Sequence, residues 1–390
     1  MAKDSARVIP LRKPWQRPVS RGLEALRRGD LTAATLDLRR AQDLAPDEPD
    51  VCLALARLHL AQEELRPAAA FLERVVTLRP DRLGAVVLLT RTLGLRLGEK
   101  TRAFGVLHVA LEHHPESAEL HVVRGELLLE DDAIEAARSA FAQALTGTPG
   151  PKVRLAALCG LAQTYNAEGI LLSEGGESDR AAFLFKRAAD LDPLWSAPLV
   201  NLGVVFGRLE RLPKAIETYD AALLRDPENP VALFNLGSIA HRLGRLDQAV
   251  EALEDLYNLA PDYPGLRVAL ANVLGDRRDF DRAIAFLLEE LEISPDSVTA
   301  WSALGLAYTC AGNTARGEEC LHEALARDPD RFDAFHNLAV IYTTQGRRDD
   351  AVAILERAFG IDPQRALRIV EADASLGPLR DLPRLRRWFT

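Results

Sequence analysis

The stretch LVNLGVVFGRLERLPKAIETYDAALLRDPENP, residues 199–230, is followed almost at once by LFNLGSIAHRLGRLDQAVEALEDLYNLAPDYP, residues 233–264. Asn-Leu-Gly recurs after 34 residues, and each stretch holds two apolar runs with a helical period. A short turn separates the runs, Pro213 suits the first turn of the second helix, and Pro227 stops that helix. The stretch therefore predicts a helix–turn–helix unit that is repeated.

The same spacing runs through most of the chain of 390 residues. The prolines that close an apolar run are Pro46, Pro80, Pro115, Pro149, Pro193, Pro227, Pro261, Pro295, Pro329 and Pro363. Their spacings are 34 or 35 residues except for one of 44, which predicts ten units with about ten extra residues in the fifth. We assign the excess to a connector at residues 147–151 and to LLSEGGESD, residues 171–179, as a lengthened turn, and we place a hinge there.

The pattern resembles the tetratricopeptide repeat, whose signature combines Leu-Gly with alternating bulky and small residues. In the ninth unit the matching residues are Trp301, Leu304, Gly305, Tyr308, Leu321, Ala324 and Pro329. In the tenth they are Phe335, Leu338, Ala339, Tyr342, Ala351, Leu355, Ala358 and Pro363. The resemblance implies an all-α, right-handed superhelix, a solenoid of stacked helix pairs with a concave groove and a C-terminal capping helix.

This register predicts four segments of the chain. They are a basic flexible leader (1–14), four divergent repeats (15–151), six repeats that carry the insertion at 171–179 (152–365) and a cap (366–390). Repeat one lacks the first bulky residue, while repeat eight has Arg267 and Glu290 in place of apolar or small residues, so its packing is in doubt. The residues expected to cover the last helix pair are Leu382, Leu385, Trp388 and Phe389, although Arg386, Arg387, Trp388 and Phe389 would also suit a docking peptide.

The charge of the chain is uneven. The net charge is −9, but residues 1–28 carry +6 and the remainder carries −15. We read the basic leader as a solvated tail, and the alternative is contact with anionic lipid, nucleic acid or an acidic protein. The four cysteines are far apart, no signal peptide is recognised and no segment is long and apolar enough to span a membrane, so we expect a cytoplasmic protein.

No constellation of catalytic residues stands out, and no phosphate-binding glycine loop or H-E-x-x-H sequence is present. The best metal candidates, His113, His114, Glu116, Glu119 and His121, straddle a helix-ending proline, where solvated polar residues are normal. The loop SEGGESD has only three carboxylates and lacks the spacing of a calcium loop. We therefore predict no enzyme activity, no metal and no cofactor.

The resemblance also implies which residues face the groove, because the first helix of each pair lines it. Asn201, Asn235 and Asn337 precede Leu-Gly or Leu-Ala, which is similar to the asparagine ladder in the repeat region of O-linked N-acetylglucosamine transferase. An amide can both donate to and accept from a peptide backbone; alternatively, these amides bond to the array itself. The other residues expected to face inward are Val200, Val204, Phe234, Ser238, His241, Arg242, Val268, Asn272, Ser302, Leu306, His336 and Val340.

These residues do not form the Lys and Asn carboxylate clamp of chaperone-binding family members. Exposed Val and Phe instead favour an apolar peptide or an amphipathic helix as the ligand. The predicted function is a non-catalytic scaffold or adaptor that binds a partner protein in its groove and helps assemble a complex, with no nucleic-acid ligand. The alternatives are a substrate-recruiting subunit of an enzyme complex and a peripheral membrane adaptor that uses the basic leader.

Overall fold

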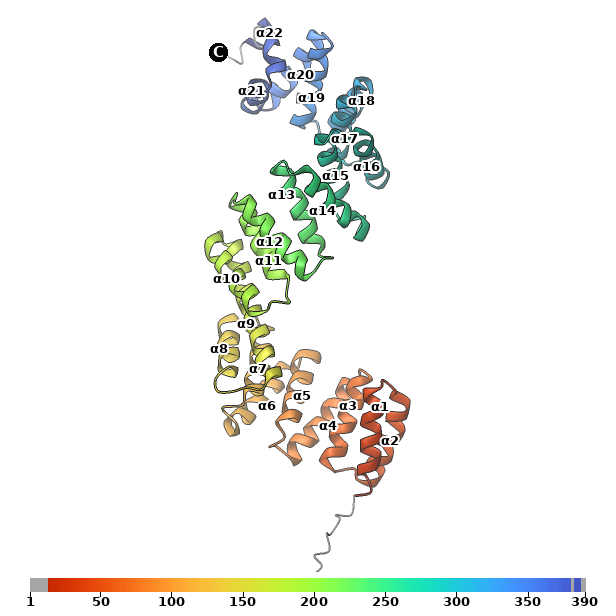
Figure 1. The fold of residues 1–390 in the computed structure, drawn as a ribbon, viewed down its shortest axis with the longest axis vertical. Helices are drawn as coiled ribbons and strands as arrows, with labels where there is room; N and C mark the ends of the chain where they lie inside the picture. The colour runs from red at the N-terminus through yellow and green to blue at the C-terminus, as the bar shows by residue number, and fades with distance from the viewer. Residues whose placement is uncertain (1–12, 380–381, 387–390) are drawn as a thin grey trace, which may run out of the picture. The chain divides into compact units, whose positions relative to one another are not determined.

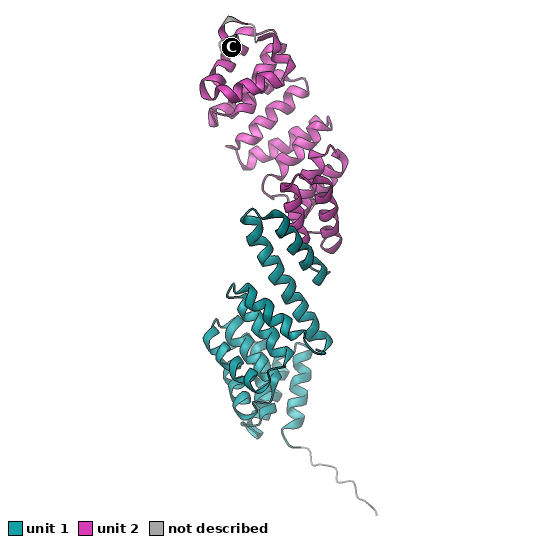
Figure 2. Ribbon diagram, turned by 90° about the vertical axis from the view of Figure 1, so that its left-hand side faces the viewer, with its two compact units in different colours: residues 1–198 teal, residues 199–390 magenta. Residues whose placement is uncertain are grey.

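The computed structural model describes residues 13–379 and 382–386, which contain helices and turns but no strand (Figure 1). The chain divides into two compact units, unit 1 (residues 1–198) and unit 2 (residues 199–390), which Figure 2 shows in teal and magenta. Within each unit, consecutive helices pack as pairs, and each pair packs on the next. The all-α repeat architecture predicted from the sequence is confirmed. Most of the predicted leader, residues 1–12, lies outside the described residues.

The helices follow the repeat spacing. Unit 1 contains α1 (Gln16–Arg27), α2 (Leu31–Leu44), α3 (Pro49–Ala61), α4 (Leu65–Leu78), α5 (Leu83–Arg91), the π-helix η1 (Thr92–Arg96), α6 (Lys100–His113), α7 (Ala118–Leu129), α8 (Ile134–Ala144), α9 (Pro151–Glu174) and α10 (Ser178–Leu191). The unit boundary falls in the first turn of α11 (Ala197–Arg208). Unit 2 continues with α12 (Leu212–Arg225), α13 (Pro230–Arg242), α14 (Leu246–Leu259), α15 (Leu266–Asp276), α16 (Phe280–Ile293), α17 (Val298–Cys310), α18 (Thr314–Arg327), α19 (Phe332–Thr344), α20 (Arg348–Ile361), α21 (Pro363–Ala372), the 3₁₀ helix η2 (Ala374–Leu379) and α22 (Pro383–Arg386).

Local capping chemistry sets the helix ends. The Asn229 side chain accepts a hydrogen bond from the backbone N–H of Ala232 (3.0 Å), and Pro230 occupies the first turn of α13. Ser297 caps α17 in the same way, through the N–H of Ala300 (3.3 Å). Since a proline such as Pro227 follows the C-cap of α12, that helix cannot continue. The recurring Asp-Pro and Asn or Ser positions therefore produce the regular helix lengths.

The glycine of the Leu-Gly pair lies where two helices approach closely. A Cβ atom on Gly203 would lie 2.6 Å from the Tyr219 ring, and one on Gly237 would lie 2.5 Å from Leu253. Both distances are shorter than van der Waals contact, so a larger residue would force the two helices of a repeat apart. The repeat signature therefore records a steric requirement of the helix pair.

Repeat eight, formed by α15 and α16, packs through its two departures from the signature. The Arg267 side chain is only 9% exposed and lies 3.8 Å from the Glu290 carboxylate, with Asp262 at 3.1 Å. Burial opposes the charged form, but the hydrogen bond and the charge of Asp262 raise the pKa of Arg267, so the guanidinium stays ionised. The Glu289 carboxylate also lies 3.7 Å from the guanidinium, so repeat eight packs around an arginine whose charge is matched by Glu290 and by two further carboxylates.

The fifth repeat is longer because of its helix, and the prediction of a lengthened turn at residues 171–179 is wrong. Helix α9 spans 24 residues, and only residues 175–177 separate it from α10. A Cβ on Gly160 would lie 2.3 Å from Phe141 of α8, whereas one on Gly169 would lie 2.7 Å from Phe185 of α10. The extra residues thus give one helix two close-packing sites, one for each neighbour. The compact units divide after residue 198, in the first turn of the next helix.

The predicted C-terminal cap is confirmed for the described residues. Helix α21 supplies Ala366 and Val370 to the hydrophobic cluster of α19 and α20, and η2 and α22 add Leu376, Leu379 and Leu385. Leu382 packs against the same cluster, whereas Trp388 and Phe389 lie outside the described residues. These side chains cover the apolar face that the last repeat would otherwise expose.

Candidate peptide-binding surface

The candidate surface lies on the first helices of the repeats in unit 2, from α11 to α19. Three predicted residues are exposed: Arg242 on α13, Asn272 on α15 and Leu306 on α17, of which 45% is accessible. The half-buried members of the predicted set are Asn201, Val204, Phe234, Asn235, Ser238, His241, Val268, His336, Asn337 and Val340. The surface therefore offers short neutral and apolar side chains at the 34-residue period of the repeats.

Two residues predicted to face the groove are buried instead. Val200 is 7% exposed and belongs to the hydrophobic cluster of unit 2. Ser302 is 3% exposed and donates a hydrogen bond to Asp333 (3.0 Å). Both residues occupy the same place in the repeat, before Asn201 in one case and before Ala303 in the other, and each contacts its own neighbours: Val200 the hydrophobic cluster and Ser302 the Asp333 carboxylate. The expectation that Val200 and Ser302 offer binding surface is therefore wrong.

The asparagines predicted to form a ladder differ in their contacts. The side chains of Asn235 and Asn337 form no hydrogen bond with any described residue. Asn201 is half-buried and already takes part in an interaction. On α13 and α19, therefore, the amides keep their donors and acceptors for a ligand or for water.

Several polar residues of the predicted set are held by intramolecular partners. His241 Nε2 lies 2.6 Å from Asp276 Oδ2, and Arg242 donates to Glu210 (2.6 Å). The hydroxyl of Ser238 donates to the Phe234 carbonyl (2.8 Å). A ligand would have to compete with these contacts, so their side chains are poorer anchors than the free amides.

The last predicted imidazole is also paired. His336 Nε2 lies 2.8 Å from Asp373 Oδ2, which joins α19 to the end of α21. The neighbouring Ser375 and, to a smaller degree, His336 lower the pKa of Asp373. His336 therefore holds the cap against the last repeat.

Sequence reasoning missed one member of this surface. Tyr263, in the turn before α15, packs against Phe234 with ring centroids 5.2 Å apart and planes tilted by 38°. The pair half-buries Phe234 and makes an aromatic rim at the start of α13 and α15. The only signal in the sequence was the aromatic residue between two prolines, in a turn whose path the helical period does not give.

Within the described ranges, no three His, Cys, Asp or Glu side chains lie close enough together to hold a metal ion. His121, from the best sequence candidate, contacts the backbone carbonyl of Pro115 (2.6 Å) instead. None of the helices in the described part is both long and apolar enough to cross a bilayer.

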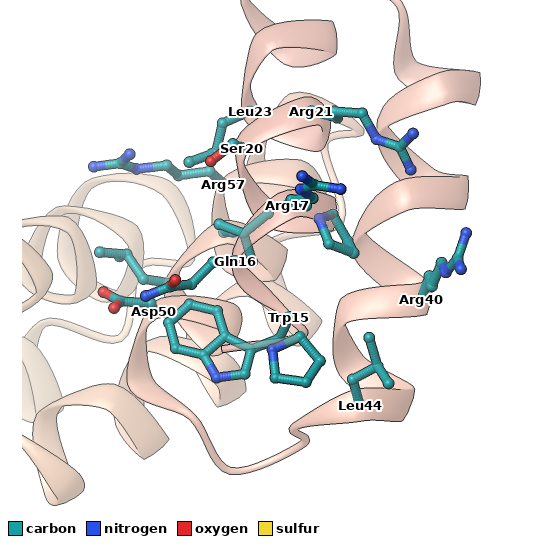
Figure 3. A pocket seen from close by; sticks show the side chains of 15 residues that line it. Trp15, Gln16, Arg17, Ser20, Arg21, Leu23, Arg40, Leu44, Asp50 and Arg57 are labelled. Atoms are coloured by element: carbon teal, nitrogen blue, oxygen red, sulfur yellow. The ribbon is translucent and has the colours of Figure 1, made fainter. Parts of the chain in front are cut away.

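A separate cavity of about 1070 Å³ surrounds α1 in unit 1 (Figure 3). It was not predicted, because it needs side chains of α1, α2 and α3 together. Its charged lining residues are Arg17, Arg21, Arg40, Asp50 and Arg57. Its apolar lining includes Leu23, Leu44, Leu53, Ala54 and the buried Trp15.

Comparison with known proteins identifies the repeat. Models of the tetratricopeptide repeat match residues 25–90, 95–151, 200–264, 240–307 and 308–372. The chain belongs to the tetratricopeptide repeat family. Proteins with tetratricopeptide repeats generally act as protein-interaction scaffolds, and all helix pairs of unit 2 through α20 fall within the matched ranges.

Individual relatives are similar over part of their length or in fold. The tetratricopeptide repeat domain-containing protein PYG7 of Arabidopsis thaliana, a chloroplastic protein, is 35% identical over 72 residues, which are 18% of this chain and 24% of the relative. MamA is 23% identical, with a TM-score of 0.41 over 43% of this chain and 92% of MamA. YrrB, described as having an unusual peptide-binding site, is 22% identical, with a TM-score of 0.39 over 48% of this chain and 97% of YrrB. A chain of the Cut9–Hcn1 hetero-tetramer of APC/C is 14% identical, with a TM-score of 0.44 over 93% of this chain and 96% of its own.

Proposed function

We propose that this tetratricopeptide repeat protein is a non-catalytic scaffold that holds a segment of a partner protein against the first helices of unit 2. The observation that carries the proposal is the combination of unpaired amides at Asn235 and Asn337 with exposed Asn272 and Leu306 on the helices between them. Amides can bind a backbone of any sequence, and an exposed leucine can take an apolar side chain. The preferred ligand is therefore an extended or helical segment of low charge.

The distribution of charge on this surface supports the same ligand. His241 and Arg242, the charged or ionisable residues nearest its centre, are matched by Asp276 and Glu210. A strongly charged ligand would meet no uncompensated opposite charge from these residues. Cys52, Cys159, Cys310 and Cys320 are free thiols, which supports a reducing compartment such as the cytoplasm.

The test begins with affinity purification and mass spectrometry to identify the partner, followed by calorimetric titration with the purified partner. Replacing both Asn235 and Asn337 by Ala should weaken binding roughly five- to a hundredfold, because each lost hydrogen bond contributes about 0.5 to 1.5 kcal/mol. Thermal stability should change little, since the exposed side of this surface is solvated when empty.

Charge reversal on the outer helices provides the matched control. Lys186 of α10 and Glu251 of α14 are exposed and lie on second helices of their repeats. Their reversal should leave the affinity unchanged. The proposal fails if the double variant of Asn235 and Asn337 stays folded and binds as tightly as the wild type while an outer-face variant loses binding.

A further inference from the structure

The cavity around α1 has an excess of positive charge that no residue in the described ranges neutralises. Arg17, Arg40 and Arg57 are exposed, and their side chains form no ion pair or hydrogen bond with any described residue. The fourth arginine, Arg21, is paired with Asp37 (2.5 Å). Three guanidinium groups therefore remain available to a ligand.

The acidic residue of the lining does not offset this charge. The Asp50 carboxylate accepts a hydrogen bond from Arg82 at 2.5 Å, so it is already matched by a cation of the next repeat. Guanidinium groups bind carboxylates through two parallel hydrogen bonds, and such charge-assisted bonds are stronger than neutral ones. The cavity is thus complementary to an anion with carboxylate-like geometry.

The shape of the cavity limits the ligand further. Figure 3 shows Asp50 and Arg57 on one side of α1 and Arg40 and Leu44 on the other, with Trp15 and Arg17 between them. A small anion cannot reach both sides of a helix, whereas an extended chain that crosses the first turns of α1 can. Leu44 is 50% exposed, and Leu53 is half-buried, so the crossing chain would also meet apolar surface.

We propose that this cavity docks an extended acidic segment of a partner protein, in which carboxylates alternate with apolar side chains. The site lies within unit 1 and rests on observations independent of the surface in unit 2. Trp15 is only 7% exposed, so its ring is not offered for stacking against a nucleic-acid base. A cavity that passes across a helix can hold a single extended chain, whereas the flat surface of a membrane cannot enter it.

A solvated end face is the structural alternative, because terminal repeats need polar outer surfaces. Such a face requires only polar side chains of either sign. Here the three side chains without a described partner all carry the same sign, line the same cavity on both sides of α1 and adjoin apolar surface. The pattern is therefore specific to an anionic ligand.

The experiment measures fluorescence anisotropy of a labelled peptide in which Glu alternates with Leu, added to the full chain. The triple variant Arg17→Glu, Arg40→Glu and Arg57→Glu should bind at least about tenfold more weakly than the wild type. A matched variant changes the same charge elsewhere in unit 1, at Arg28, Arg66 and Arg154, which are exposed and also unpaired among the described residues. It should bind within about twofold of the wild type, because its charges lie outside the cavity. Circular dichroism should give equal helicity for all three proteins.

Four results would overturn the proposal. The first is that the triple variant binds the Glu-Leu peptide as tightly as the wild type does. The second is that the wild type binds the Glu-Leu peptide no more tightly than a Gln-Leu counterpart. The third is that the arginines control binding to phosphatidylserine vesicles or oligothymidylate instead of the peptide. The fourth is a wild-type dimer in sedimentation that the triple variant loses, because the occupant would then be a second copy of the chain. Weakening confined to the acidic peptide and to the cavity variant would support it.

Discussion

Repeats eight and nine of unit 2 fill the same position with different chemistry. In repeat nine, formed by α17 and α18, Trp301 packs against two hydrophobic clusters. Its indole N–H donates to the Pro295 carbonyl (2.8 Å), and the Arg327 guanidinium lies over the indole, 5.1 Å from the ring centroid. In repeat eight the equivalent residue is Arg267, which is matched to Glu290 where repeat nine has Ala324. Both side chains fill the contact between neighbouring helices, which we call the seam. Trp301 fills it with buried apolar surface, whereas Arg267 fills it with a charge that is matched by carboxylates. The comparison shows that the repeat signature tolerates a polar seam when both of its sides change together.

Truncation of the apolar seam should have the largest effect. Trp301→Ala should lower the free energy of unfolding by about 3 kcal/mol, at the lower end of large aromatic truncations because the ring is only partly buried. Urea denaturation measures the loss, and hydrogen exchange should show it in α17 and α18, since repeat arrays transmit instability mainly to neighbours. If the denaturation curve of the variant equals that of the wild type, the Trp301 ring does not stabilise the contact between the two clusters.

Removal of one charge from the polar seam should have the next largest effect. Arg267→Leu leaves Glu290, whose side chain is 18% exposed, without its matched cation. The expected cost is about 2 kcal/mol, less than for a fully buried broken pair because water still reaches the carboxylate. Urea denaturation again measures the loss in the free energy of unfolding. The control is Arg277→Leu, because the side chain of Arg277 is 46% exposed. If both leucine variants cost the same, the ion pair contributes nothing to the seam.

A double variant of repeat eight gives its seam the uncharged residues that repeat nine has. The double variant Arg267→Leu and Glu290→Ala removes both charges, so its stability should return to within about 1 kcal/mol of the wild type. The measurement is a double-mutant cycle. Additive losses from the two single changes would contradict the view that Arg267 and Glu290 compensate each other.

The sequence was sufficient for most of the fold because each repeat carries its own local signals. The spacing of prolines such as Pro227 and the Leu-Gly pairs predicted the helix pairs, since both reflect contacts within one repeat. It was insufficient for repeat eight, because Arg267 and Glu290 were judged one at a time, whereas their effect depends on the pair. The length of α9 was missed because Gly175 and Gly176 suggested a long loop, although the helix continues to Glu174.

The candidate site was predicted less completely than the fold. A helical period gives the face of a residue but not how far the next helix covers it, which is why Val200 proved buried while Leu306 is exposed. The period also says nothing of turns, so Tyr263 was missed. The cavity around α1 requires side chains from three helices, and no single stretch of sequence contains that arrangement.

The central claim is that the first helices of unit 2 hold the partner, and site-specific photo-crosslinking tests it most directly. A photoreactive residue would replace Leu306, which is exposed on α17, and, in a separate protein, Glu251, which is exposed on α14. The account predicts a crosslink to the purified partner from position 306 and none from position 251. A crosslink from position 251 with none from position 306 would contradict it, because the partner would then lie on the outer helices.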